Sequence, residues 1–334
     1  MVDTRTRIAN ILSFRSVDRL PIIEWAGWWT QTADRWHREG LPAELTDPAE
    51  IRDYFGLDGM RQHWFRPQGP KCPNPPGHGL GIIADADDYQ RIREHLYPEA
   101  SFDADTLRRW DRRQRDGKLF VWFTMEGFFW FPRTLFGIEE HLYAFHDHPE
   151  LMHQINEDLL QHHLRTLDRA CELCVPVFMT FAEDMSYNHG PMISRSQFDE
   201  FMAPYYRRII PALKERGIIP FIDTDGLVHE LVPWLMEVGV EGFLPLERMA
   251  GVDVPELRRR YPTLRMIGGF DKTVMHRGEQ AIRAEFERLL PAMSSGGYVA
   301  ACDHQTPPEV SIDDYRLYVR ILKEYAEMAA RNMT

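Results

Sequence analysis

Acidic side chains follow most of the short apolar runs in this sequence, and they are the residues best suited to chemistry. The stretch FIDTDG places Asp223 and Asp225 at the end of a strand-like run, with Gly226 directly after them. Two carboxylates one residue apart either cap the next helix or belong to a site, because buried carboxylates repel one another unless they are compensated. The other acidic run ends are Glu24, Glu126, Glu183, Asp184, Glu247, Asp271 and Asp303, the last followed by His304.

Capping is a plausible role for any single member of this set, and Asp271, followed by Lys272, has the pattern of a cap. The whole set is harder to explain in that way. If all the runs end at one rim, the carboxylates need cations, hydrogen-bond donors or raised pKa values to coexist. The pattern therefore indicates a site that holds a metal ion or binds a ligand rich in donors.

Aromatic residues follow the same runs. They suggest a flat apolar pocket for an aromatic or macrocyclic ligand, although a simple lid over the core would use the same residues. The polar loop AEDMSYNHG follows another run and is typical of a site-forming loop. The residues expected to bind substrate are Trp25, Trp28, Trp29, Glu126, Trp130, Tyr187 and Asn188.

The elements that must position these residues alternate between strand and helix patterns. Clear apolar runs fall within residues 118–126, 175–184, 217–225, 239–247, 263–271 and 296–304, and helices are expected from about 137, 194 and 227. The run LPIIEW (20–25) and a weaker strand between 55 and 85 bring the number of strands to about eight. Alternation of this kind predicts parallel βαβ units and an α/β fold, a single (β/α)8 TIM barrel over residues 1–334.

The barrel is expected to carry an N-terminal helical addition (1–18) and a loop rich in Pro and Gly (66–81). An open doubly wound sheet is the alternative, but it would want a Gly-rich phosphate loop after an early strand, and none is present. In a barrel the strand ends carry the chemistry, so the acidic residues would meet at one face.

Composition narrows the classes of partner. The 334 residues carry a formal charge of −12, which argues against a nucleic-acid or anionic-membrane surface. The N-terminal stretch lacks the apolar region of a signal peptide and no run approaches 18 apolar residues, so we expect a cytoplasmic protein. Four cysteines in a chain of this length do not make a disulfide framework.

Four blocks of sequence cover residues 5–25 and much of 118–325. They are RIANILSFRSVDRLPII, AEDMSYNHGPMISRSQFDEFMAPYYRRI, FLPLERMAGVDVPELRRRYPTLRMIGGFDKTVMHRGEQAI and GGYVAACDHQTPPEVSIDDYRLYV. Together they resemble the uroporphyrinogen decarboxylase superfamily. The resemblance implies the same (β/α)8 barrel and leaves two chemistries open, decarboxylation and corrinoid-linked methyl transfer.

The residues after the first strand depart from the decarboxylase pattern. True uroporphyrinogen decarboxylases carry Arg-Gln-Ala-Gly-Arg there, and the arginines face the carboxylates of the substrate. This chain reads Glu24-Trp25-Ala26-Gly27-Trp28, so both arginines are gone. Uroporphyrinogen is therefore not the expected substrate.

The fifth strand departs from the methyltransferase pattern in a different way. Zinc-binding members of that branch have His-x-Cys-Gly at this place and a later cysteine near the eighth strand. This chain keeps the frame as Asp223-x-Asp225-Gly226, which replaces soft ligands by hard carboxylates. Either the metal differs, or no metal is bound, or the ligands are redistributed to Asp225, Glu247 and His304.

The resemblance and the residues together favour a methyltransferase or demethylase. It would take a methyl group from a small aromatic or amine substrate and pass it to a corrinoid carried by a partner protein, with a divalent metal, zinc or a harder ion, as possible cofactor. The alternatives are a carboxy-lyase on another substrate and a non-catalytic tetrapyrrole- or corrinoid-binding module. The decarboxylase resemblance also implies a homodimer. The residues expected to be catalytic are Glu183, Asp184, Asp223, Asp303 and His304.

Overall fold

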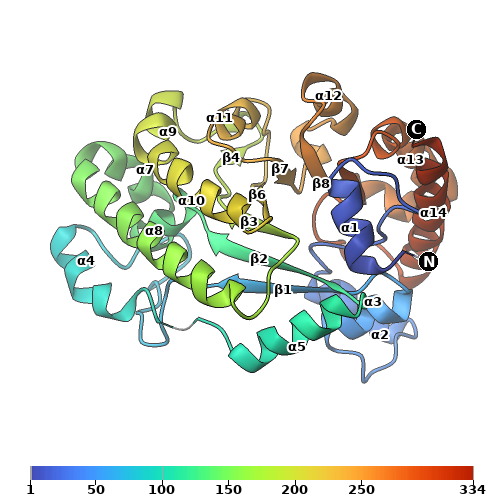
Figure 1. The fold of residues 1–334 in the computed structure, drawn as a ribbon, viewed down its shortest axis with the longest axis horizontal. Coiled ribbons are helices and arrows are strands. Elements are labelled where there is room, and N and C mark those ends of the chain that lie inside the picture. Colours follow the sequence, from blue (N-terminus) through green and yellow to red (C-terminus); the bar gives the residue numbers. More distant parts are fainter. Residues whose placement is uncertain (1, 100, 334) are drawn as a thin grey trace.

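Seven parallel strands form the main sheet of the computed structural model, which describes residues 2–99 and 101–333 (Figure 1). The sheet follows chain order, so each strand pairs with the next main strand along the sequence. A two-stranded hairpin, β4 (Ser186–Tyr187) and β5 (Gly190–Pro191), interrupts the numbering. The main strands are β1 (Met60–Phe65), β2 (Phe120–Glu126), β3 (Phe178–Ala182), β6 (Ile219–Asp223), β7 (Gly242–Leu244), β8 (Arg265–Phe270) and β9 (Tyr298–Cys302).

Helices connect the strands, as parallel pairing requires, and the sheet curls into an α/β TIM-barrel-like fold (Figure 1). The long helices pack on its outer side, α5 on β2, α10 on β6 and α13 on β8 and β9. The helices are α1 (Thr4–Leu12), α2 (Thr30–Arg38), α3 (Pro48–Phe55), α4 (Ala86–Ile92), α5 (Ala104–Arg115), α6 (Trp130–Phe136), α7 (Ile138–Asp147), α8 (Pro149–Cys171), α9 (Arg195–Phe201), α10 (Ala203–Glu215), α11 (Leu231–Glu237), α12 (Val254–Arg260), α13 (Glu279–Met293) and α14 (Ile312–Asn332), with 3-10 turns at Arg93–His95, Arg248–Ala250 and Lys272–Arg277.

The apolar runs of the sequence form these strands because parallel strands are covered on both faces. All seven residues of β2 are buried, which matches its nearly continuous apolar sequence FVWFTME. The predicted fold class is confirmed, and so are the six clear strands and the weaker strand between residues 55 and 85, which is β1.

The predicted strand at residues 20–25 is wrong, because this segment forms no strand in the structure. It lies between β9 and β1, where an eighth strand would close the barrel. Side-chain carboxylates, however, accept hydrogen bonds from backbone amides that would otherwise pair with a neighbouring strand. The Ile22 amide donates to Asp58 Oδ2 at 2.9 Å, and the Glu24 carboxylate accepts from the Cys302 amide at 3.1 Å. Pro21 has no amide hydrogen to donate.

Glu24 connects this segment to both of its neighbours. Its carboxylate is fully buried and also accepts from the Tyr318 hydroxyl at 2.6 Å. Burial raises the pKa of Glu24 to about 7, although the bonds from Tyr318 and the Cys302 amide act in the opposite direction. Glu24 is therefore a structural residue of the barrel seam.

Replacing Glu24 by glutamine is expected to remove one source of pH-dependent stability. The pKa of Glu24 is about 7 in the folded state, against an ordinary value of 4.5. Between these two pH values the folded state therefore keeps a proton on Glu24 that the unfolded chain has lost. This difference stabilises the folded state by on the order of 3 kcal/mol. The stabilisation is fully present below pH 4.5 and is lost as the pH rises through 7. Denaturant unfolding at about pH 5 to 8 should show the wild-type curve falling relative to Glu24→Gln; parallel curves would contradict this assignment.

Helix α1 lies across the amino ends of the strands. The Thr4 amide donates to the Gly117 carbonyl just before β2, and the Gly297 amide donates to the Ile11 carbonyl just before β9. The helix is shorter than the predicted 1–18 and ends where Phe14 adopts a φ of +57°. Because α1 covers this end, the site must lie at the carboxyl ends of the strands.

The loop predicted at 66–81 is present, and the helix predicted from about 227 is shifted along the chain. The loop at 66–81 contains no helix or strand segment, as predicted. The helix expected from about 227 begins later, at Leu231, because the Leu227 amide is bonded instead to the Tyr187 carbonyl of the β4–β5 hairpin. Within the described part of the chain, no helix is long and apolar enough to span a bilayer.

Candidate active site

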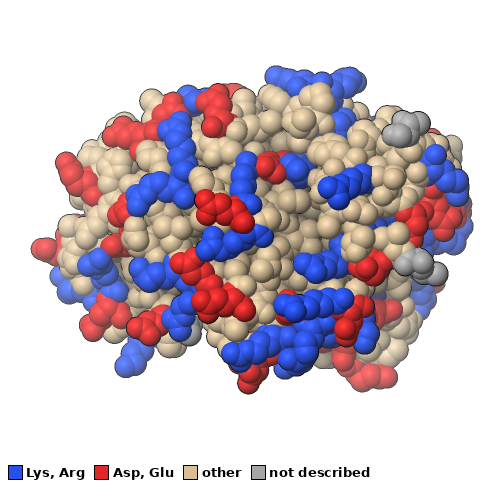
Figure 2. All heavy atoms as spheres, in the orientation of Figure 1, with Lys and Arg blue, Asp and Glu red and all other residues tan. Residues whose placement is uncertain are grey.

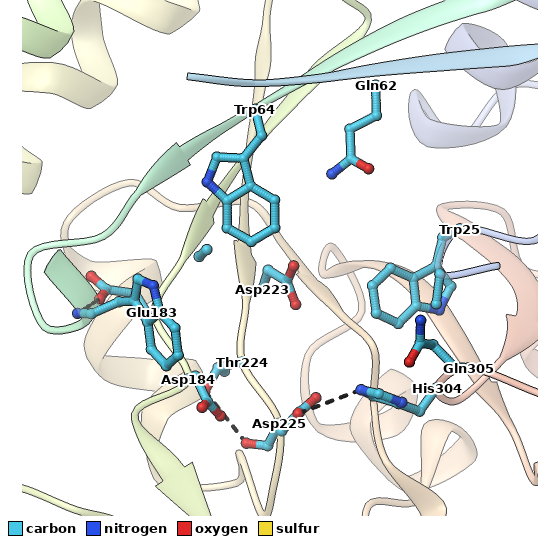
Figure 3. Close-up of a pocket in the computed structure, with 13 residues that line it drawn as sticks. Trp25, Gln62, Trp64, Glu183, Asp184, Asp223, Thr224, Asp225, His304 and Gln305 are labelled. Carbon is cyan, nitrogen blue, oxygen red and sulfur yellow. Dashed lines mark hydrogen bonds and ion pairs between the residues drawn. The ribbon is translucent and has the colours of Figure 1, made fainter. Parts of the chain in front are cut away.

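A cavity of about 320 Å³ opens at the carboxyl ends of the strands (Figure 3). Its acidic wall comes from the residues that end β3 and β6 and the residues after them. Aromatic and amide side chains of β1 and of the segments after residue 24 and after β9 face this wall (Figure 3). The polar and aromatic residues that line it are Trp25, Gln62, Trp64, Trp130, Glu183, Asp184, Asp223, Thr224, Asp225, His304 and Gln305.

The pair Asp223 and Asp225 does not cap a helix. Helix α11 begins at Leu231 without a side-chain cap, and within residues 2–99 and 101–333 neither carboxylate accepts a hydrogen bond. Both line the cavity instead. Burial raises the pKa of Asp223 well above its ordinary value, and the charges of Asp225 and Asp184 add to this effect. Asp223 is therefore suited to carry a proton into the cavity.

Asp225, Glu247 and His304 converge at one point of the cavity rim. One ligand-type atom of each lies within 4.8 Å of the others, and His304 Nε2 is 3.7 Å from Asp225 Oδ2 (Figure 3). Two carboxylates and an imidazole from different loops form a donor set that suits zinc or a harder divalent ion, with positions left open for a ligand. The residues present therefore fit a divalent metal.

Electrostatics at this point also favour a cation. Burial, then the charges of Glu247 and Asp184, raise the pKa of Asp225 to about 7. Burial and the nearby Lys272 lower the pKa of His304, which keeps the imidazole in the neutral form that binds metals. A cation among these groups would relieve the repulsion between the carboxylates.

The backbone that presents these residues is tightly constrained. Gly226 has a φ of +80°, and a Cβ there would lie 2.7 Å from the backbone of Ser186 and Tyr187. The Gly226 amide donates to Glu247 Oε2 at 3.0 Å, so the two loops are joined next to the three converging residues. Asp184 (φ +40°) and Leu246 (φ +66°) are also left-handed, which is costly for residues with a side chain and is common at functional sites.

Asp303 lies behind the cavity. Its buried carboxylate accepts from the Arg248 amide at 3.0 Å and from Lys272 Nζ at 3.2 Å, and it does not line the cavity. Lys272 Nζ is in turn 4.0 Å from Glu247 Oε1. The geometry therefore gives Asp303 a positioning role instead of the direct catalytic role predicted for it. Asp271 caps a 3-10 turn through Thr273, as its sequence suggests.

Glu183, for which a catalytic role is predicted, contributes to the cavity wall, but its carboxylate is engaged by hydrogen bonds. Its Oε2 accepts from the amides of Phe129 at 2.8 Å and Trp130 at 3.1 Å, and its Oε1 accepts from the Phe128 amide at 2.9 Å and from the Tyr206 hydroxyl. The side chain is fully buried, and burial raises its pKa to about 7. This carboxylate holds the loop that leads into α6, so the capping alternative describes it.

The predicted aromatic residues separate into two groups. Trp25 and Trp130 line the cavity, and Trp25 Nε1 donates to the Cys302 carbonyl at 2.8 Å. Trp28 packs against Trp36 and other aromatic rings, and with Trp29 it lines a second, neighbouring cavity.

Three other predicted substrate or site residues lie outside the first cavity. Tyr187 and Asn188 are exposed at the β4–β5 hairpin. Glu126 is fully buried and accepts from Trp64 Nε1 at 3.1 Å and Arg66 Nη1 at 2.9 Å, and burial raises its pKa to about 7. Asp184, in contrast, lines the cavity and pairs with Arg133 Nη1 at 3.4 Å.

Sequence reasoning missed Gln62 and Trp64 on β1 and Gln305 after His304. The strand MRQHWF is too polar to stand out as a barrel strand. Once it is recognised, the two-residue period of a strand puts positions 62 and 64 on one face and shows that both can reach the site.

Comparison with known proteins agrees with this fold. A sequence model of the family described as uroporphyrinogen decarboxylase (URO-D) matches residues 85–325. The chain therefore belongs to the uroporphyrinogen decarboxylase family.

Individual relatives are distant. The chain is 27% identical over 190 residues to a uroporphyrinogen decarboxylase of Pseudomonas fluorescens, with 54% of this chain and 50% of that protein covered. The enzyme of the same name from Bordetella pertussis is 27% identical over 194 residues, with 52% and 50% covered. The chain thus spans about half the length of the curated relatives it matches.

A solved methyltransferase from Methanosarcina mazei has the same fold over nearly the whole chain. The TM-score is 0.67 at 16% identity, with 97% of this chain and 99% of the other covered. Identity this low supports the shared barrel and says nothing further about chemistry.

Proposed function

We propose that this protein is a methyltransferase that removes a methyl group from a small methylated aromatic or amine substrate and delivers it to a corrinoid held by a partner protein. The observation that carries the proposal is the convergence of Asp225, Glu247 and His304 within 4.8 Å at the mouth of an aromatic-walled cavity. The fold shared with a methyltransferase is consistent with it.

The three converging residues would hold a divalent metal. When bound, the metal would supply a Lewis acid that polarises the heteroatom carrying the methyl group. The rings of Trp25, Trp64 and Trp130 would hold a flat or cationic substrate against this point.

Asp223 would supply the proton that the reaction needs. The bond between the methyl carbon and the heteroatom would break, and the methyl group would pass without the bonding electrons to the corrinoid, which would supply the electron pair of the new bond. The heteroatom keeps its own pair and takes a proton. Asp223 lines the cavity and its raised pKa favours the protonated form that can donate.

A carboxy-lyase is the second candidate. The similarity to decarboxylases favours it, and a protonated Asp223 could equally protonate the carbon left after loss of CO2. Residues 25–29, which read Trp-Ala-Gly-Trp-Trp, provide no arginine for a polycarboxylate, so its substrate would differ from uroporphyrinogen.

The test is methyl transfer to free cobalamin reduced to the cob(I) state. Purified protein is incubated with methoxybenzenes and methylamines, with and without added zinc or manganese, and methylcobalamin is followed by its absorbance. We expect formation that depends on the metal and falls about 100-fold or more in Asp223→Asn, the range of lost general-acid catalysis. Glu230→Gln, an exposed carboxylate on the same loop, is the matched control and should retain activity. Release of CO2 from carboxylated pyrroles without any methylcobalamin would favour the lyase instead.

A further inference from the structure

A second cavity, of about 720 Å³, adjoins the candidate active site. It lies among α2, α3, β1 and α5, on the side of the barrel where residues 20–25 take the place of a strand. Four residues line both cavities, so the two cavities are adjacent and share part of a wall. The shared residues are Trp25, Ala26, Gln62 and Gln305.

Three arginines from three different elements line this second cavity: Arg52 of α3, Arg61 of β1 and Arg109 of α5. Arg52 donates to the Glu24 carbonyl at 3.2 Å and Arg61 to the Met60 carbonyl at 2.7 Å. Arg109 donates to the Thr106 hydroxyl at 2.8 Å. Within residues 2–99 and 101–333, none of the three lies within 4.0 Å of a carboxylate.

These three guanidinium groups, which have no ion pair in the described part of the chain, share the wall of one cavity. The chain carries a net charge of −12, and Arg108, next to Arg109, pairs with Asp105 at 2.9 Å. The single carboxylate in the described part of the cavity wall, Asp47, accepts from the Ala49 amide at 2.6 Å as the cap of α3. Figure 2 shows basic side chains gathered along α5, at the lower edge of the view. Among the described residues, the wall thus carries three arginines against one carboxylate, and no arginine of the three is ion-paired with it within 4.0 Å.

Aromatic faces complete the wall. Trp28, Trp29 and Trp110 line the cavity, and the Arg52 guanidinium lies 5.6 Å from the centre of the Trp28 ring. Trp29 is 44% exposed although it is large and apolar. Guanidinium groups beside open indole rings suit a planar molecule with an anionic group, because arginine binds carboxylate, sulfonate or phosphate oxygens through two parallel donors.

We propose that this second cavity is an anion subsite that binds the carboxylate, sulfonate or phosphate group of an aromatic molecule through Arg61 and Arg109, with Arg52 behind them. The molecule would extend past Gln62 and Gln305, so that its other end lies at the acidic cavity. That this other end carries the methyl group rests on the proposed function. Binding of the anion does not rest on it.

Calorimetric titration of metal-free protein in EDTA tests the subsite. The probes are benzoate, benzenesulfonate and phenyl phosphate, with benzyl alcohol as the neutral analogue, and the three anions show which oxyanion is preferred. We expect at least one anion to bind, benzyl alcohol to bind more weakly, and the double variant Arg61→Gln/Arg109→Gln to lose about tenfold or more in affinity, as expected for lost charge-assisted bonds.

The matched control is Arg108→Gln/Arg112→Gln, which removes the same charge from neighbouring positions of α5 outside the cavity wall. It should keep the affinity. The proposal is overturned if no anion binds, if benzyl alcohol binds as tightly as the anions, or if both double variants lose affinity equally. Thermal unfolding of each variant confirms that it is folded. The titration contains no metal and measures no methyl transfer, so a failure of anion binding can be distinguished from a failure of the proposed methyl transfer. Anion binding can also succeed where methyl transfer fails.

Discussion

Replacement of His304 by alanine is expected to weaken binding of zinc or manganese by more than about 100-fold. Loss of a residue that only supports a metal ligand already costs about 10- to 100-fold, and His304 would be a ligand itself. It is the single nitrogen donor of the three converging residues, and it lies 3.7 Å from Asp225. Calorimetric titration of the metal into protein stripped with a chelator measures the effect.

His189→Ala is the control for this experiment, because His189 is exposed in the β4–β5 turn and lies outside the cavity. Equal affinity in wild type and His304→Ala, or equal losses in both variants, would exclude the proposed ligand set. Affinity should also rise as the pH increases through about 7, since Asp225 must lose its proton to bind a metal.

Replacement of Glu183 by alanine is expected to destabilise the protein by about 3–5 kcal/mol. The change removes the acceptor for three backbone amides and for the Tyr206 hydroxyl, and these donors stay buried without partners. The loop before α6 would lose its anchor, and Trp130 would shift in the cavity wall. Chemical denaturation followed by circular dichroism measures the loss.

Glu183→Gln separates this structural role from a catalytic one. A glutamine has the same shape and keeps one acceptor oxygen, so Glu183→Gln should recover part of the stability lost in Glu183→Ala. If Glu183 transferred protons in the reaction, the amide could not replace it and the enzyme would stay inactive. We expect the activity of Glu183→Gln to follow its stability. A folded Glu183→Gln protein with activity reduced as strongly as in Asp223→Asn would show that Glu183 takes part in the chemistry.

The rim of the barrel is predictable from the sequence because strand ends are local features. Apolar runs of about five to nine residues mark the strands, and parallel pairing brings the residues after them to one edge. The strand-end pattern therefore places Asp225, Glu247 and His304, which are far apart in the chain, on one rim, and the resemblance to zinc-binding methyltransferases offers them as one of three alternatives for the metal site. The structure brings these three residues within 4.8 Å of one another.

The direction of each side chain cannot be predicted in the same way. Glu183 and Asp184 are neighbours at one strand end and both contribute to the cavity wall, yet the carboxylate of Glu183 is bonded to backbone amides and that of Asp184 pairs with Arg133. The donors that decide this come from the loop at 127–130, and nothing in the local sequence shows that their amides point toward Glu183. Trp28 likewise turns toward Trp36, which belongs to a helix whose packing is a tertiary property.

The segment at 20–25 has the composition of a strand, and only the competing donors and acceptors around it show that it forms none. Asp58 and Glu24 take part in bonds that a backbone ladder would have made. A buried polar side chain can replace a ladder bond at one position without changing the apolar pattern, so the sequence does not reveal the substitution.

This seam has a consequence for access to the site. A fully closed barrel admits ligands only through its mouth, since a continuous ladder of strands separates its inside from its flank. Here the residues shared by the two cavities, Trp25, Ala26, Gln62 and Gln305, all lie at the seam between β9 and β1. On the proposed binding mode, a ligand held in both cavities would cross the barrel wall at this seam, and its length would be matched to the distance across the wall instead of the width of the mouth.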